Sequence, residues 1–139
     1  MRVLIDTNVL FSAVYRSGSV PHQAYLKAIE HPFQCLVCEQ SFIELRSTFV
    51  KKFPETGDLI ERFIRMLQAV VETIPIPDTI HPDEAKLRDP DDATILRAAL
   101  AASADIIITG DLDFLESGID SIKMISAKQF LQINCMHEQ

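Results

Sequence analysis

Five short apolar segments alternate with stretches of helical periodicity along this chain, and this alternation restricts the fold more than any other feature. The segments predicted as strands are residues 3–5, 33–37, 71–76, 105–109 and 121–125. Helices are predicted at 20–30, 39–53, 58–70, 90–103, directly after Asp111, and from Ser126 to Ile133. Strands that alternate with helices form parallel βαβ units. We therefore predict an α/β fold, a three-layer α/β/α sandwich with a central parallel sheet of about five strands.

Individual segments refine this prediction. Residues 105–109 are almost continuously apolar, as expected of a strand buried on both faces. A polar turn is expected after the first strand, and a loop is expected at 78–90, where prolines interrupt the chain. In the 58–70 helix, the spacing predicts an apolar stripe of Leu59, Phe63, Met66 (or Leu67) and Val70.

The size and composition of the chain indicate one domain spanning 1–139. It has 139 residues, of which 47% are hydrophobic, and domains cluster at about 100–200 residues. No apolar run approaches the ~20 residues of a membrane span. The N-terminal apolar segment ends at Asp6, which disfavours a secretion signal. Three cysteines without an export signal indicate a reducing cytoplasm.

The formal net charge of −7 opposes binding of nucleic acid through bulk charge. A protein of this charge that acts on nucleic acid needs a local basic patch or bound cations. Lys51, Lys52, Arg62 and Arg65 could form such a patch, although charges at these positions are more often a solvated helix face. No aromatic platform for stacking bases is evident.

Carboxylates from four chain segments are expected at one edge of the predicted sheet. Sites in open parallel sheets form at the carboxyl ends of the strands. Helices that follow the strands begin at the same edge. The five carboxylates placed there are Asp6, Glu44, Asp92, Asp111 and Asp113.

Each carboxylate also has a purely structural interpretation. Asp6 and Asp111 could cap turns or helices, and the sequence from Asp89 through Asp92 has the form of an N-cap with acidic first-turn residues. Glu44 lies on a helical wheel opposite the stripe of Phe42, Leu45, Phe49 and Phe53, which predicts a solvated position. Taken together, so many carboxylates at one edge repel one another unless a cation intervenes. Ligands that are all oxygen suit Mg²⁺ or Mn²⁺, and such a metal supports phosphodiester hydrolysis.

Three motifs resemble those of the PIN domain family. They are Val3-Leu4-Ile5-Asp6-Thr7-Asn8-Val9-Leu10, Asp89-Pro90-Asp91-Asp92-Ala93 and Ile107-Ile108-Thr109-Gly110-Asp111-Leu112-Asp113-Phe114-Leu115. Their order and separation also fit, and the resemblance covers essentially the whole chain. Within this family, a chain of this size is similar to the VapC-type toxins of prokaryotic toxin–antitoxin pairs.

The resemblance implies a Mg²⁺-dependent endoribonuclease with an antitoxin partner. The acidic set that it implies is Asp6, Glu44, Asp92 and Asp111, with Asp113 as an adjacent metal ligand. Thr7, Asn8 and Thr109 would orient these carboxylates or waters through hydrogen bonds. Asp92, rather than Asp91, matches the acidic position of the second motif. The resemblance and the apolar helices at 39–53 and 58–70 also imply a homo-oligomer, most simply a dimer.

Other functions fit the sequence less well. A haloacid-dehalogenase-like phosphatase needs a second Asp where this chain has Asn8, and a response-regulator receiver domain needs a Lys where it has Ser126. A catalytically inactive PIN-fold binding module remains an alternative. Cys35 and Cys38 have CxxC spacing without a second pair, and Cys135 is distant. The four histidines, His22, His31, His81 and His137, show no metal-binding spacing.

Overall fold

Five parallel strands form one sheet in the order β3-β2-β1-β4-β5. The computed structural model describes residues 1–134. The strands are β1 (Arg2–Ile5), β2 (Gln34–Cys38), β3 (Glu72–Ile74), β4 (Ile106–Ile108) and β5 (Lys123–Ile125). The predicted parallel sheet of five strands is confirmed, with strand ends that differ from the predicted ones by up to two residues.

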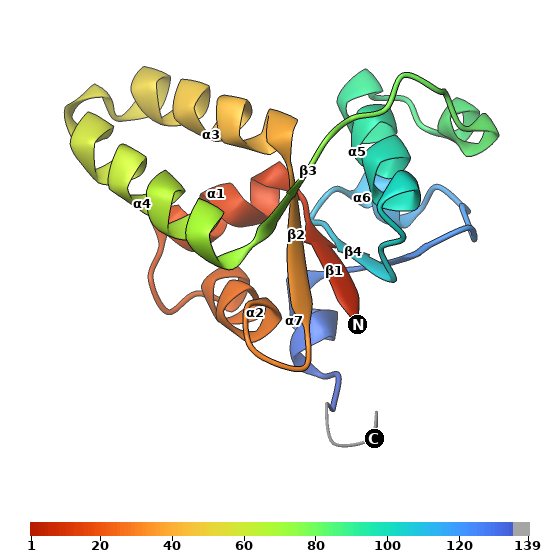
Figure 1. Ribbon diagram of the computed structural model, residues 1–139, viewed down its shortest axis with the longest axis horizontal. Helices are drawn as coiled ribbons and strands as arrows, with labels where there is room; N and C mark the ends of the chain where they lie inside the picture. The colour runs from red at the N-terminus through yellow and green to blue at the C-terminus, as the bar shows by residue number, and fades with distance from the viewer. Residues whose placement is uncertain (135–139) are drawn as a thin grey trace.

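Helices cover both faces of the sheet, which confirms the predicted three-layer sandwich (Figure 1). One face packs against α1 (Thr7–Tyr15), α2 (Val20–Ala28), α3 (Glu39–Lys52), α4 (Gly57–Val70) and α7 (Ala127–Leu131). The other face packs against α5 (Pro90–Ala101) and α6 (Leu112–Leu115). Two 3-10 turns complete the fold, η1 (Pro54–Thr56) and η2 (Pro82–Lys86). Within residues 1–134, no helix is both long and apolar enough to cross a membrane.

The central strands contribute side chains to two separate hydrophobic clusters. Val3 and Ile5 of β1 belong to the cluster under α1–α4, whereas Leu4 belongs to the cluster under α5. Ile107 of β4 likewise points opposite to Ile106 and Ile108. Side chains alternate across a strand, so a strand covered on both faces must be apolar throughout. This requirement explains the continuous apolar runs in the sequence.

The prediction of a polar turn after the first strand was wrong, because residues 7–15 form helix α1. Asp6 is its N-cap and accepts a hydrogen bond from the Thr7 N–H. Val9, Leu10 and Ala13 face the core and stabilise the helix through burial. The polar residues at the start of the segment are capping residues here, and the same residue types are also common in turns.

The predicted apolar stripe of α4 was wrong for most of its members. The buried residues of α4 are Ile60, Ile64 and Leu67, whereas Leu59, Met66 and Val70 are exposed. Apolar residues occupy two adjacent faces of this helix, so helical periodicity fits both faces equally well. Packing against α3 selects which of the two faces is buried.

The segment predicted as a loop at 78–90 contains η2, which an ion pair fixes to α5. The Arg97 guanidinium donates to both carboxylate oxygens of Glu84 and to the Pro77 carbonyl. Glu84 also accepts a hydrogen bond from the His81 N–H. The Arg97 side chain holds the pKa of Glu84 below its ordinary value. These contacts tie the segment that leads into Asp89 to the body of α5.

Candidate active site

The centre of the sheet is where the strand order reverses, because β1 pairs with β2 on one side and with β4 on the other. Crevices at the carboxyl ends of such strands are the usual ligand sites of open α/β folds. Asp6 directly follows β1, and Thr109 directly follows β4. The Asp6 N–H donates to the Ile108 carbonyl at 2.9 Å, which extends the pairing of the two strands up to the site.

A pocket of about 150 Å³ opens at this point. Its lining residues are Asp6, Thr7, Asn8, Glu44, Asp89, Asp91, Asp92, Ile95 and Asp111. Four of the five carboxylates expected at this edge therefore lie together. The fifth, Asp113, is exposed and does not line the pocket; its backbone N–H donates to Asp111.

Asp6 is held rigidly in a buried position by two donors. The Thr109 hydroxyl donates to its Oδ2 and the Thr7 N–H donates to its Oδ1, both at 2.8 Å. Burial raises the pKa of Asp6, and the charges of Asp111 and Asp89 raise it further, while the two hydrogen bonds lower it. Thr109 also accepts a hydrogen bond from the Asp111 N–H at 3.1 Å, so it links two of the carboxylate segments.

Within residues 1–134, Asp92 has a buried side-chain oxygen without a hydrogen-bond partner. Its residue is 6% exposed, and its buried Oδ2 has no hydrogen-bond partner among the described residues. Burial raises the pKa of Asp92 to about 8, with contributions from a hydrogen bond to Asp111 and from the charges of Asp6 and Asp89. Buried polar oxygens are nearly always paired, so an orphaned one calls for a bound proton or cation.

Asp89, Asp92 and Asp111 each offer one carboxylate oxygen, and these three oxygens lie within 4.8 Å of one another. Asp89 also performs the capping role that its sequence predicts, because it accepts a hydrogen bond from the Asp91 N–H. The sequence pattern around Asp89 predicted the capping role alone. Its position at the start of a helix that begins at the same sheet edge was the available signal for a second role.

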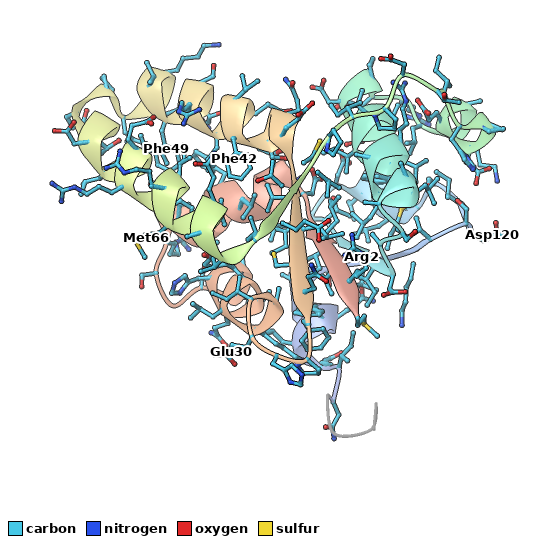
Figure 2. All side chains as sticks on the ribbon, in the orientation of Figure 1. Arg2, Glu30, Phe42, Phe49, Met66 and Asp120 are labelled. Atoms are coloured by element: carbon cyan, nitrogen blue, oxygen red, sulfur yellow. The ribbon has the colours of Figure 1, made fainter. Side chains whose placement is uncertain are left out.

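Glu44 is not on a solvated face of α3. It is partly buried and lines the pocket, while Phe42 and Phe49 of the same helix are buried on the side that faces the core (Figure 2). Burial raises the pKa of Glu44, and the negative charges of Asp91, Asp6 and Asp89 add to this effect. Helix α3 is therefore covered on more than one side at its N-terminal end.

Thr7 and Asn8 connect α1 to its neighbours. The Thr7 hydroxyl lies 2.7 Å from the Ser41 hydroxyl of α3, and Ser41 is fully buried. The Asn8 side-chain oxygen accepts a hydrogen bond from the Gly110 N–H at 3.4 Å. The role of Ser41 was not predicted, because nothing in the local sequence distinguishes this residue from an ordinary helix serine.

Neither Cys35 and Cys38 nor the described histidines line the carboxylate pocket. Cys35 and Cys38 are free and buried in different hydrophobic clusters, on opposite faces of the sheet. Burial raises the pKa of the Cys35 thiol to about 12. Histidines 22, 31 and 81 do not line the pocket. Cys135 and His137 lie outside the described residues.

Replacing Thr109 by valine is expected to destabilise the protein by about 1–3 kcal/mol, because the buried Asp6 loses a donor. Valine has nearly the same shape, so the effect comes from the hydroxyl. Urea unfolding measures the change. The same substitution in an Asp6→Asn background should cost less, since no charged acceptor remains. If Thr109→Val lowers the free energy of unfolding equally in wild type and in Asp6→Asn, the Thr109–Asp6 hydrogen bond contributes little to stability.

Comparison with known families agrees with the geometry. A family model described as the PIN domain matches residues 2–113, a range that contains every carboxylate discussed above. The chain belongs to the PIN domain family. Comparison with curated proteins gave no match.

The fold of this PIN domain is similar to several solved structures. VapBC2 from Rickettsia felis, solved bound to a DNA fragment from its promoter, matches with a TM-score of 0.69 at 13% identity, covering 89% of this chain and 97% of that one. VapBC-1 from nontypeable Haemophilus influenzae matches with a TM-score of 0.69 at 14% identity, covering 92% and 99%. The sarcin-ricin-loop-cleaving toxin VapC20 from Mycobacterium tuberculosis matches with a TM-score of 0.56 at 16% identity, covering 86% and 98%.

PIN domains generally bind a divalent metal, and the residues of this PIN domain fit one. The donors gathered in the pocket are carboxylate oxygens, which Mg²⁺ and Mn²⁺ prefer. The Asp92 Oδ2 has no hydrogen-bond partner in the described part of the chain, and the pKa values of Asp6 and Asp92 are raised mainly by burial and further by neighbouring carboxylates. A bound cation would compensate for both effects.

Proposed function

We propose that this PIN domain is a Mg²⁺-dependent or Mn²⁺-dependent endoribonuclease that hydrolyses RNA phosphodiester bonds as the toxin of a toxin–antitoxin pair. The observation on which the proposal mainly rests is the unpaired, buried Asp92 Oδ2 within a cluster of carboxylates at the strand-order reversal. A structural role as helix cap does not explain it, because a capping carboxylate bonds to backbone N–H groups.

The metal would be held by Asp6, Asp92 and Asp111, with Glu44 and Asp89 lining the same pocket. Asp113 remains an adjacent candidate ligand, although its side chain is exposed. When bound, such a cation neutralises charge on the phosphate and activates water for hydrolysis.

The side chains around the carboxylates fix their positions before substrate binds. Thr109 orients Asp6 and the backbone of Asp111, and Ser41 orients Thr7. Glu44 lines the pocket, and burial raises its pKa, which makes its carboxylate a stronger proton acceptor for an attacking water. Catalytic contributions from prearranged groups of this kind come from reduced reorganisation during the reaction.

The experiment that tests this function is metal-dependent cleavage of total cellular RNA. We expect discrete RNA fragments with Mg²⁺ or Mn²⁺ and none with EDTA. Excess metal added after EDTA should restore cleavage. A phosphatase of the haloacid dehalogenase kind would instead release phosphate from a small aryl phosphate, which we do not expect here. Intact RNA under every metal condition would favour the inactive binding module.

The proposed antitoxin partner is supported by the solved structures that share this fold. Two of them are VapBC pairs, one of them bound to promoter DNA. By analogy, this chain would be the nuclease of such a pair and would act in the cytoplasm, where its RNA substrate is found. Co-expression with the product of the adjacent gene, followed by purification of a complex, tests the pairing.

Self-association through helix α4 is expected in solution at micromolar concentration. Met66 is 67% exposed on the outer side of α4 (Figure 2), close to the exposed Leu59 and Val70. An exposed apolar helix face of this kind is normally buried against a partner, here a second copy of the chain. Light scattering should give twice the 15.6 kDa mass of the chain.

Met66→Lys should shift the protein toward the monomer. The matched control is Ile80→Lys, because Ile80 is 68% exposed but lies in the loop before η2. A monomeric wild-type protein, or a dimer that Met66→Lys leaves intact, would rule out this interface.

A further inference from the structure

Two hollows continue from the carboxylate pocket along helix α1. The first, of about 270 Å³, shares Asn8 with the pocket and also contacts Ser12, Pro21 and Ser126. The second, of about 240 Å³, shares Ser12 and Pro21 with the first and reaches Tyr15, Arg16 and Ser19. Each hollow shares lining residues with the next, so the three are neighbours along α1. We call the two hollows together the α1 groove and define it by Asn8, Ser12, Tyr15, Arg16, Ser19 and Pro21.

One face of α1 forms the floor of this groove. Asn8 and Ser12 are four residues apart and share one side of the helix, and Arg16, the C-cap, follows directly after its last residue. Leu10 and Ala13 are buried in the core, and the buried Val9 borders the first hollow. A helix rises about 1.5 Å per residue, so Arg16 lies about 12 Å along the axis from Asn8. That distance corresponds to about three or four stacked nucleotides.

The groove differs in charge from the pocket that it joins. Among residues 1–134, no carboxylate lines either hollow, whereas the lining contains hydroxyls, the Asn8 amide and the Arg16 guanidinium. Arg16 is exposed, and within the described part of the chain its side chain has no ion pair or hydrogen bond. In a chain of net charge −7, an unpaired cation in a hollow that none of the described carboxylates lines is well placed to attract a phosphate.

An aromatic ring stands at the same end of the groove. Tyr15 is 54% exposed, and its ring stacks on Phe53 at 5.2 Å and on Phe11 at 6.0 Å between centroids. The ring is therefore fixed in place while half of the residue remains open to solvent. Rigid, exposed aromatic rings next to a cation are the usual elements for binding single-stranded nucleic acid.

We propose that the α1 groove binds the single-stranded RNA segment adjacent to the cleaved bond, with Arg16 contacting a backbone phosphate and Tyr15 stacking on a base. The proposal rests on the proposed ribonuclease function and extends it by naming where the substrate strand lies. An acidic peptide could also use Arg16. The carboxylate pocket, which shares Asn8 with the groove, and the exposed Tyr15 ring favour RNA.

The test measures binding of a short, fluorescein-labelled single-stranded RNA by anisotropy in EDTA, so that no cleavage interferes. Arg16→Gln should weaken binding about fivefold to tenfold at low salt. Losing one phosphate contact should also make the slope of log K against log salt shallower by about 0.7. The matched control is Arg62→Gln, which removes an exposed cation of α4 and should change neither quantity.

The stacking contact has its own pair of variants. Tyr15→Leu should weaken binding about tenfold without changing the salt slope, whereas Tyr15→Phe should bind like wild type. Thermal melts show whether Tyr15→Leu is folded, and the Arg16 variant tests the groove independently. Binding by Arg16→Gln with wild-type affinity and slope, or an equal loss in Arg62→Gln, would overturn the proposal.

Cleavage of total RNA in Mg²⁺, measured in parallel, separates this inference from the proposed function. If wild type cleaves RNA and Arg16→Gln cleaves it with an unchanged KM, the groove assignment fails and the nuclease assignment stands. If binding depends on Arg16 but wild type never cleaves with metal, the groove assignment stands and the nuclease assignment fails.

Discussion

Asp6→Asn and Asp111→Asn are each expected to reduce metal-dependent RNA cleavage by about 100-fold or more, because each removes a charged oxygen from the proposed metal site. Asparagine keeps the shape of Asp6 and can still accept the hydrogen bond from the Thr7 N–H. The asparagine introduced by Asp111→Asn can likewise still cap α6 through its side-chain oxygen. The loss should therefore arise from the lost charge, with the fold retained. Initial rates of fragment formation in excess Mn²⁺ measure the effect.

The matched control is Asp120→Asn, which removes the same charge from the exposed loop between α6 and β5 (Figure 2). Its cleavage rate should equal that of wild type. Circular dichroism of all three variants should be unchanged. Near-wild-type cleavage by Asp6→Asn or Asp111→Asn would show that these carboxylates do not hold the catalytic metal.

Asp92→Asn is expected to make the metal-free protein more stable than wild type at pH 7, by about 2–4 kcal/mol. Burial among like charges raises the pKa of Asp92 to about 8, so ionising it in the folded state is costly. An asparagine at this position carries no charge, and its amide can donate to the Asp111 carboxylate. The expected rise in melting temperature is about 7–14 °C.

The effect should depend on pH in a defined direction. A carboxyl whose pKa is higher when folded binds its proton more tightly in the folded state. Its contribution to stability is complete below the unfolded pKa of ~4 and is lost as pH rises toward the folded value of about 8. Wild type should therefore lose stability relative to Asp92→Asn from pH 4 to pH 8, and the two should be similar near pH 4.

We expect excess metal to reverse the order of the two melting temperatures. Mn²⁺ should bind the folded wild type and raise its melting temperature, whereas Asp92→Asn should gain little. Melts of both proteins at pH 5 and pH 8, with EDTA and with excess Mn²⁺, provide the measurement. If Asp92→Asn melts below wild type in EDTA at pH 8, and metal stabilises both equally, the carboxylates do not form a shared cation site.

The layer order and strand number followed from the sequence because both depend on local patterns. The apolar run at 106–108 has no polar face to expose, so it requires cover on both sides of the sheet. Parallel strands place their carboxyl ends at one edge, which allowed Asp6, Asp92 and Asp111 to be assigned to one site from their positions alone. The motifs that contain them also identified the PIN domain family, which the family match confirms.

The sequence could not decide features that depend on which surfaces pack together. Either apolar face of α4 could have been buried, and contact with α3 selected Ile60, Ile64 and Leu67. Glu44 appeared solvated on a helical wheel, yet the approach of α1 and α5 encloses it in the pocket. The polar residues at the start of α1 predicted a turn. In the folded protein they belong to a helix, which the burial of Leu10 stabilises.

The partners of individual polar atoms were also set by tertiary structure alone. Ser41 is distant from Thr7 in sequence, and their hydroxyls meet only because α1 packs on α3. The orphaned oxygen of Asp92 and the raised pKa of its carboxyl result from burial beside Asp111. Residue type and spacing determined which groups gather at the sheet edge. Their desolvation and mutual distances, which set their chemistry, arise only when separate segments pack together.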